Sequence, residues 1–344
     1  MGKTAIVLFN LGGPDRPEAV KPFLFNLFND HAILRLPQPM RYLLARLISS
    51  RRAPLAREIY GHLGGGSPIL AFTQAQAAAL EAELSSRGED REYRTFIAMR
   101  YWHPMSPETA AAVQAFSPDD VVLLPLYPQF STTTSASSLA AWQKAAAQAG
   151  IQAPAYAVCC YPTAAGFCRA VAKLLDATLE KEGGAPRVLF SAHGLPKKIV
   201  AAGDPYEWQV NETARKVIEE VGRPGLDWTV CYQSKVGPLE WIGPSLDDEI
   251  KRAAKDRVPV VIVPIAFVSE HSETLVELDI QYREIAMGEG VPGYARVPTV
   301  SDAPDFIRGL ADLVFHARQR GHDLGSESGA RICPKDFSGC PNHG

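Results

Sequence analysis

The sequence predicts an α/β protein built from two doubly wound parallel-sheet halves, and three observations predict it. Short apolar, β-branched runs alternate with longer segments of helical period along the 344 residues. Strands and helices that alternate in this way form parallel sheets whose faces are covered by helices. The alternation suits two similar halves better than one very wide sheet. Polar, proline and glycine residues also cluster at 148–156, which marks a boundary between the halves.

The predicted strands are the apolar, β-branched runs at residues 5–10, 93–100, 121–127, 155–161, 188–192, 228–233 and 258–267. The predicted helices have helical spacing of apolar residues and occupy 17–28, 39–48, 73–86, 109–115, 136–149, 164–182, 206–221, 272–287 and 304–318. We therefore divide the chain into a first half (1–150), a second half (151–301), a helix (302–320) that can fold back on the first half, and a tail (321–344). The tail is turn-rich and polar, so we expect disorder there unless something ties it down.

Composition limits the classes of function. Apolar residues make up 46% and charged residues 21%, which is ordinary for a soluble globular protein. A net charge of −3 gives no support to nucleic-acid binding. The N-terminal "MGKTAIVLFNLGGP" enters a strand without a cleavable signal, and six cysteines are too few for a disulfide scaffold. We expect a cytoplasmic protein.

Polar and aromatic side chains follow each predicted strand. The functional crevice of an open α/β sheet lies beyond the carboxyl ends of its strands. Those ends carry "LGGP" (11–14), "RYWHP" (100–104), "YPQFSTTT" (127–134), "SAHGLP" (191–196), "QSKVGP" (233–238) and "SEHSET" (269–274). None of these is a G-x-G-x-x-G fingerprint, and "GGGSP" (64–68) lacks the ending of a phosphate loop, so nucleotide binding is disfavoured.

Two of these strand ends carry ionisable candidates, His193 on one and His271, Glu273 and Glu277 on the other. A site with imidazole and carboxylate ligands is suited to binding Fe(II), Zn or Co. Imidazole is also a base whose ordinary pKa lies near the working pH. Glu273 and Glu277 would stack on a helix that starts near Ser272. An acidic residue in the first turn of a helix often does no more than complement the helix dipole. That explanation accounts for Glu273 but not for Glu277, which lies one turn further on. The alternative to a dipole role is a column of carboxylates that carries protons or cations, and the spacing alone leaves both interpretations open.

Two further groups suit a large, flat ligand that bears carboxylates. Arg100 and Tyr101 combine a cation with an aromatic ring at one strand end. The apolar residues of 33–48 and 239–242 either belong to the hydrophobic core or form an exposed apolar rim. Such a rim would admit an apolar substrate or rest on a membrane surface. The sequence leaves these two alternatives open.

Taken together, these motifs resemble the ferrochelatase family. The matching segments are "LFNLGGP", "GGGSPI", "RYWHP", "LPLYPQFSTTTSASS", "LFSAHGLP", "GDPY", "QSKVGPLEWIGP" and "VPIAFVSEHSETLVELDI", in the family's order from residue 8 to 280. The resemblance implies two flavodoxin-like halves with a porphyrin cleft between them, the chelatase fold. It implies a lyase that inserts Fe(II), as substrate, into protoporphyrin IX with release of two protons.

The resemblance also assigns roles to residues. His193 matches the active-site histidine and Glu273 the carboxylate facing it across the porphyrin, so both are candidates to handle the metal. His271 and Glu277 match neighbouring polar positions of the catalytic site. Which face delivers iron and which takes the protons stays open. The residues implied as porphyrin contacts are Leu11, Arg100, Tyr101, Ser131 and Trp241.

The cysteines of the tail raise the question of a second iron site. Some ferrochelatases hold a [2Fe–2S] cluster at the C-terminus with four cysteines, and Cys333 and Cys340 resemble a short version of that extension. The stretch in which animal members carry a ligand has Thr132 here. Cys160 and Cys159 are therefore the candidates for the remaining ligands, ahead of Cys168 and Cys231. A loose tail with two reduced thiols is the alternative.

Other functions remain compatible with the same residues. One alternative is a chelatase for another tetrapyrrole, either coproporphyrin III or a cobalt-binding sirohydrochlorin type. Another is a non-catalytic haem or iron-sulfur sensor, which would not need a relay of carboxylates. Peripheral attachment to the inner membrane and a homodimer are candidate associations that the sequence does not decide.

Overall fold

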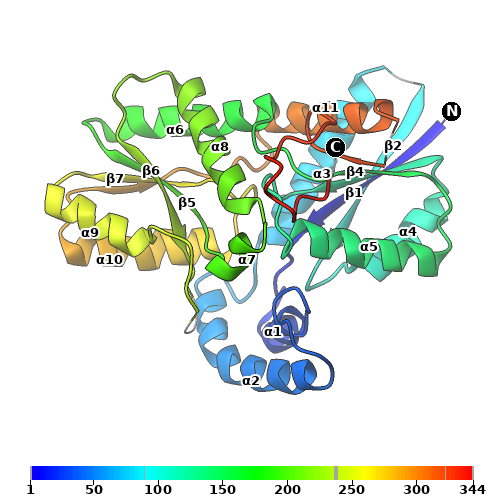
Figure 1. Ribbon diagram of the computed structural model, residues 1–344, viewed down its shortest axis with the longest axis horizontal. Coiled ribbons are helices and arrows are strands. Elements are labelled where there is room, and N and C mark those ends of the chain that lie inside the picture. Colours follow the sequence, from blue (N-terminus) through cyan, green and yellow to red (C-terminus); the bar gives the residue numbers. More distant parts are fainter. Residues whose placement is uncertain (1, 89, 236–238, 322, 343–344) are drawn as a thin grey trace.

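The computed structural model describes residues 2–88, 90–235, 239–321 and 323–342, and it contains two sheets with flanking helices (Figure 1). The first sheet has the order β2-β1-β3-β4-β9. Its strands are β1 (Gly2–Asn10), β2 (Arg91–Met99), β3 (Asp120–Pro125), β4 (Ala155–Val158) and β9 (Leu324–Gly325). The second sheet has the order β6-β5-β7-β8, with β5 (Arg187–His193), β6 (Trp228–Gln233), β7 (Val260–Pro264) and β8 (Tyr294–Arg296).

Every strand pair in both sheets is parallel, which confirms the predicted α/β class. The central strands are apolar on both faces because helices cover both sides. The five residues Ala5 to Phe9 of β1 and the residues Val260 to Val263 of β7 are almost completely buried.

The helices occupy most of the predicted segments. They are α1 (Val20–Phe28), α2 (Met40–Gly61), α3 (Ile69–Ser86), α4 (Ser106–Phe116), α5 (Ser135–Ala149), α6 (Ala165–Glu182), α7 (Lys197–Ala201), α8 (Tyr206–Val221), α9 (Leu246–Asp256), α10 (Arg283–Glu289) and α11 (Pro304–Gln319). Figure 1 shows α1 and α2 projecting below the sheets, whereas α6 and α11 run along the opposite side. Helix α11 contacts both α3 and α6, so it joins the two halves rather than serving the first alone.

The strand at 155–158 differs from the predicted division of the chain. We placed this segment in the second half, but β4 pairs with β3 in the first sheet. The first sheet therefore continues past residue 150. In addition, one hydrophobic core contains Leu8 of β1, Phe190 of β5 and Leu310 of α11. Whether the halves behave as separate domains stays a prediction.

Helix α9 was missed although its sequence carries a start signal. Ser245 accepts a hydrogen bond from the backbone N–H of Asp248, and three acidic residues fill the first turn. Such a cap satisfies one of the backbone donors that every helix start exposes. Leu246 and Ile250 then bury one face.

The segment after β7 is helical, as predicted, but most of it is not an α-helix. Residues Glu273–Tyr282 form a π-helix, and the ordinary α-helix α10 begins only at Arg283. A π-helix closes i→i+5 hydrogen bonds, is rare, and occurs frequently at functional sites. The prediction of an α-helix from Ser272 is therefore wrong in helix type.

The tail is ordered by its own residues. Strand β9 pairs with β4 at the edge of the first sheet. Glu327 accepts hydrogen bonds from the backbone N–H and the hydroxyl of Thr163, just before α6 begins. Arg331 donates to the backbone carbonyls of Cys333, Pro334, Phe337 and Asn342. The expectation was disorder unless something ties the tail down, and the pairing of β9 with β4 and the hydrogen bonds of Glu327 are such ties.

Candidate functional site

The two halves meet where β1 and β7 end. The side-chain amide of Asn10, the last residue of β1, donates to the hydroxyl of Ser269 at 3.4 Å. Gln76 of α3 donates to the backbone carbonyls of Val268 and Ser301 at 2.8 and 2.9 Å, and it accepts from Ser269. The loop that leads to His271 is therefore fixed against the strand end that leads to Leu11.

His193 is the last residue of β5, and its ring is oriented by the next peptide. Nδ1 lies 2.7 Å from the carbonyl oxygen of Gly194. Because a carbonyl oxygen only accepts, Nδ1 carries the proton of the neutral ring. The lone pair is then on Nε2, where it can bind a metal ion or take a proton. The Trp241 ring centroid lies 6.4 Å from the imidazole centroid.

Glu277 is a buried carboxyl group whose pKa is raised to about 7. Burial is the main cause, and the nearby carboxylate of Glu273 adds to it, while Ser234 and His193 oppose the rise. The Ser234 hydroxyl lies 2.9 Å from each carboxyl oxygen of Glu277. A carboxyl group with this pKa can hold or release a proton near neutral pH.

Glu273 has a carboxyl oxygen that needs a partner. Its Oε2 is buried and has no hydrogen-bond partner among the described residues. A buried polar atom without a partner costs free energy unless a proton, a cation or water supplies one. Glu273 and Glu277 therefore form a carboxylate pair that a proton or a metal cation would stabilise.

Tyr60 is a site residue that the sequence analysis missed. It comes from α2, and its hydroxyl accepts a hydrogen bond from Ser272 at 3.5 Å. Burial, with a further contribution from Glu273, raises its pKa to about 12, so it stays a neutral phenol beside the carboxylate pair. No local signal marks Tyr60, because only the packing of α2 brings it there. His271 lies nearby in sequence and is buried, with Nδ1 3.0 Å from the carbonyl oxygen of Ser269.

The polar groups of Arg100 and Tyr101 are hydrogen-bonded to a buried carboxylate and are not free to bind a ligand. Both donate to Oδ2 of Asp30, at 2.7 and 2.8 Å, and Arg100 also donates to Ser137. Burial alone would raise the pKa of Asp30, but these partners and the backbone of Ala32 hold it below its usual range. Tyr101 is only 1% exposed, which leaves little of its ring for stacking. Their role as porphyrin contacts stays a prediction.

The other predicted contacts lie in different settings. The backbone carbonyl of Leu11 accepts a hydrogen bond from the backbone N–H of Tyr101, and Leu11 packs against the hydrophobic cluster that contains Tyr101. Ser131 is buried and donates to Asp204 at 3.0 Å, and Asp204 in turn accepts from the backbone of Tyr206. Trp241 lines a cavity of about 560 Å³, and its ring lies near that of His193, which is not among the cavity's lining residues. Residues 236–238 of the "QSKVGP" motif lie outside the described residues.

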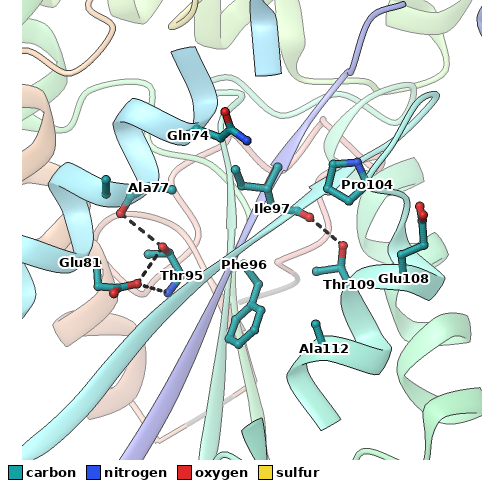
Figure 2. A pocket seen from close by; sticks show the side chains of 11 residues that line it. Gln74, Ala77, Glu81, Thr95, Phe96, Ile97, Pro104, Glu108, Thr109 and Ala112 are labelled. Atoms are coloured by element: carbon teal, nitrogen blue, oxygen red, sulfur yellow. Dashed lines mark hydrogen bonds between the residues drawn. The ribbon is translucent and has the colours of Figure 1, made fainter. Parts of the chain in front are cut away.

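A second cavity, of about 500 Å³, is remote from these groups (Figure 2). It lies along β2, the edge strand of the first sheet, between α3 and α4. Glu81 accepts from the backbone N–H of Thr95, and the Thr109 hydroxyl donates to the carbonyl of Ile97 (Figure 2). These side chains occupy the hydrogen-bonding groups of the free strand edge, which hinders pairing with another strand.

Four buried cysteines gather between β4 and the tail, and we call them the thiol pocket: Cys159, Cys160, Cys333 and Cys340. The sulfur atoms of Cys159 and Cys160 are 3.5 Å apart, and Cys333 is hydrogen-bonded to Cys340. These contacts and burial raise the pKa of the Cys160 and Cys333 thiols. No group of three or more ligands in the described part of the chain is already arranged to hold a metal ion.

The other two cysteines lie elsewhere. Cys168 donates to the carbonyl of Pro162 and Cys231 to that of Phe190, each within a hydrophobic core. The structure thus brings together the four cysteines that the sequence analysis ranked first.

Comparison with known proteins gives consistent results. A family model described as ferrochelatase matches residues 3–318. The ferrochelatase of Caulobacter vibrioides (strain NA1000 / CB15N) is 53% identical over 98% of this chain and 97% of its own. That of Pelagibacter ubique is 47% identical over 98% of each chain. The ferrochelatase of a Wolbachia from Drosophila simulans is 50% identical over 91% of this chain and 99% of its own.

Two solved structures share the fold. SirB from Bacillus subtilis with Fe3+ has a TM-score of 0.53 at 10% identity, covering 93% of this chain and 97% of that one. A multi-domain protein from Deinococcus radiodurans, described as similar to chelatases, has a TM-score of 0.51 at 14% identity, covering 94% and 57%. Identities this low support the chelatase architecture alone.

Proposed function

This chain belongs to the ferrochelatase family, and from that premise we propose which of its residues perform the reaction. The enzyme is a porphyrin metal chelatase, a lyase that inserts Fe(II) into protoporphyrin IX in the last step of haem biosynthesis. The reaction removes two protons from the pyrrole nitrogens. A planar porphyrin points its nitrogens inward, so the enzyme must expose lone pairs on one face and N–H groups on the other.

We assign the protons to the carboxylate pair. One observation carries this proposal: Glu277 is a buried carboxyl group with a pKa of about 7 beside Glu273, whose buried oxygen has no partner in the described part of the chain. Two carboxylates can accept two protons, and the Ser234 hydroxyl on Glu277 extends the path away from the pair. A sensor that only bound haem would have no use for a carboxyl group like that of Glu277, whose pKa is raised to about 7.

We assign Fe(II) to His193 on the opposite face of the porphyrin. The hydrogen bond from Nδ1 to Gly194 leaves a neutral donor at Nε2, and neutral imidazole is a suitable ligand for Fe(II). We place His271 and Tyr60 on the same face as the carboxylates. His271 is hydrogen-bonded to the backbone carbonyl of Ser269, and the Tyr60 hydroxyl accepts from Ser272.

Anaerobic metal binding without porphyrin tests this assignment. We expect His193→Ala to lose Fe(II) binding, whereas Glu273→Gln keeps it and yet fails to metalate protoporphyrin IX. The opposite pattern would give iron to Glu273 and the protons to His193. Coproporphyrin III and protoporphyrin IX should be compared in the same assay, because a strong preference for coproporphyrin III would favour the alternative substrate.

We further propose that Trp241 and Leu11 contact the porphyrin directly. Arg100, Tyr101 and Ser131 would instead hold the residues around the site in place without contacting the porphyrin. The first pair is supported by position, since Trp241 stands beside His193 and Leu11 follows the β1 end that meets Ser269. The other three use their polar groups on Asp30 or Asp204. Substitution of Trp241 should therefore raise the KM for porphyrin.

We propose that the thiol pocket holds a [2Fe–2S] cluster. Such a cluster takes four thiolates, two on each iron. The pocket offers two close pairs, Cys159 with Cys160 and Cys333 with Cys340, all buried in one place. The protons of these thiols would leave when iron binds. When bound, the cluster would supply one-electron chemistry, and the four cysteines would fasten the tail to β4.

We also propose peripheral attachment to a membrane. Large apolar side chains on α2 are exposed, namely Met40, Tyr42, Leu43, Leu47 and Leu55, and Ile33 and Leu239 of the segments 33–48 and 239–242 are exposed as well. No described helix has the length and apolarity needed to cross a bilayer. The exposed apolar side chains of α2 would lie on the surface of the inner membrane, on its cytoplasmic side. Light scattering in solution would test the candidate homodimer.

A further inference from the structure

The thiol pocket contains an amide whose orientation is fixed. Gln209 lies on α8 and is 0% exposed. Its Oε1 accepts a hydrogen bond from the backbone N–H of Phe130 at 2.7 Å. Because an N–H only donates, the oxygen must face Phe130 and the NH2 group must face the other way. That NH2 group lies 3.1 Å from Cys333 Sγ and 3.4 Å from Cys160 Sγ.

This arrangement is costly unless the sulfur atoms carry negative charge. A fully buried amide loses its hydration, and the loss is offset only by good hydrogen bonds. A neutral thiol is a weak acceptor, so two thiols offset it poorly. An ionised acceptor makes hydrogen bonds roughly twice as strong as a neutral one. The amide of Gln209 therefore fits two thiolates that are held by iron.

The position of Gln209 also joins three separate segments. Phe130 belongs to the loop after β3, Cys160 follows β4, and Cys333 belongs to the tail. The tail has other anchors, in the pairing of β9 with β4 and at Glu327, so Gln209 is not needed to order it. The role of this side chain thus concerns the sulfur atoms.

We propose that Gln209 is a positioning residue for the [2Fe–2S] cluster. Its amide donates to the thiolates of Cys160 and Cys333, brings these ligands together, and raises the reduction potential of the cluster. This inference rests on the proposed cluster in the thiol pocket. Reduction adds one electron to the cluster without forming or breaking a bond. Hydrogen bonds to the sulfur atoms stabilise the more negative, reduced state.

The test compares Gln209→Leu and Gln209→Glu with the wild type. Leucine removes the donors and keeps an apolar shape, whereas glutamate keeps the acceptor for Phe130 and replaces the amide by a charge. Gln129→Leu is the matched control, because Gln129 is also a buried glutamine but donates to Thr213 and to the carbonyl of Ile265. The measurements are iron and acid-labile sulfide content, and a redox titration with reduced viologen dyes followed by electron paramagnetic resonance.

We expect Gln209→Leu to keep its iron and sulfide but to favour the oxidised cluster about tenfold more than the wild type does. For one electron this is a shift of about 59 mV to more negative potential. Gln209→Glu should shift at least as far, and Gln129→Leu should not shift. Loss of the cluster from both Gln209 variants, with unchanged thermal unfolding, would also support the positioning role.

The possible failures are distinguishable. A wild-type protein without iron and sulfide refutes the cluster proposal, and the role of Gln209 with it. A wild-type protein that holds the cluster, with Gln209 variants of the same potential and the same cluster content, refutes the role of Gln209 alone.

Discussion

Replacing Glu277 by glutamine should stabilise the protein, and more so as the pH rises. The folded-state pKa of Glu277 is about 7, against 4.5 for the ordinary group. Glutamine keeps the shape and can still accept from Ser234, but it carries no charge to bury beside Glu273. The mutation therefore removes a destabilising term from the folded state.

The sign and size follow from proton linkage. Below pH 4.5 both the folded and the unfolded protein hold this proton, so the group adds no penalty. Between pH 4.5 and 7 the unfolded chain has released it while the folded protein still holds it, so the free energy of unfolding falls as the pH rises. Above pH 7 the penalty is constant. Each pKa unit corresponds to about 1.4 kcal/mol, so the stability gap between variant and wild type should widen by about 2 to 3 kcal/mol from pH 5 to pH 8.

Urea unfolding followed by tryptophan fluorescence at pH 5, 6, 7 and 8 measures this gap. Glu284→Gln is the control, because Glu284 is exposed on α10. Its effect should stay within about 0.5 kcal/mol over the same range. A gap for Glu277→Gln that stays constant from pH 5 to pH 8 would mean that burial and Glu273 do not perturb this carboxyl group.

Four further outcomes are expected. His193→Ala should abolish porphyrin metalation, and a variant that inserts Fe(II) at the wild-type rate contradicts the assignment. Glu273→Gln should leave porphyrin binding intact and lower turnover at least ~100-fold, the low end for a lost acid–base group; equal losses in binding and turnover would indicate a structural role. Wild-type protein should contain two irons and two sulfides per chain, and Cys333→Ser should lose them; a colourless, active wild type with alkylatable thiols refutes the cluster. Leu43→Ser combined with Leu47→Ser should abolish flotation with neutral liposomes, and no flotation of the wild type would refute membrane attachment.

The sequence by itself determined the class of fold and the chemistry of the strand ends. Buried strands and amphipathic helices are local patterns, so the alternation of the two was readable without tertiary information. The end-of-strand rule then selected His193, His271 and Glu273, because parallel strands in one sheet deliver their carboxyl ends to one edge. Long motifs such as "SEHSETLVELDI" added the family resemblance, which the comparisons support.

Only the tertiary structure decided the partners that these residues have. The placement of Tyr60 beside Glu273 and the hydrogen bond from Arg100 to Asp30 both depend on contacts between segments far apart in the chain. The same holds for the tail, whose polar composition suggested disorder. Hydrogen bonds and ion pairs form between whichever groups the fold brings within about 3 Å, and a sequence pattern does not encode that distance. The amide of Gln209 illustrates this physical limit. Its spacing on α8 marks it as an inward-facing residue, but only folding places it between two sulfur atoms.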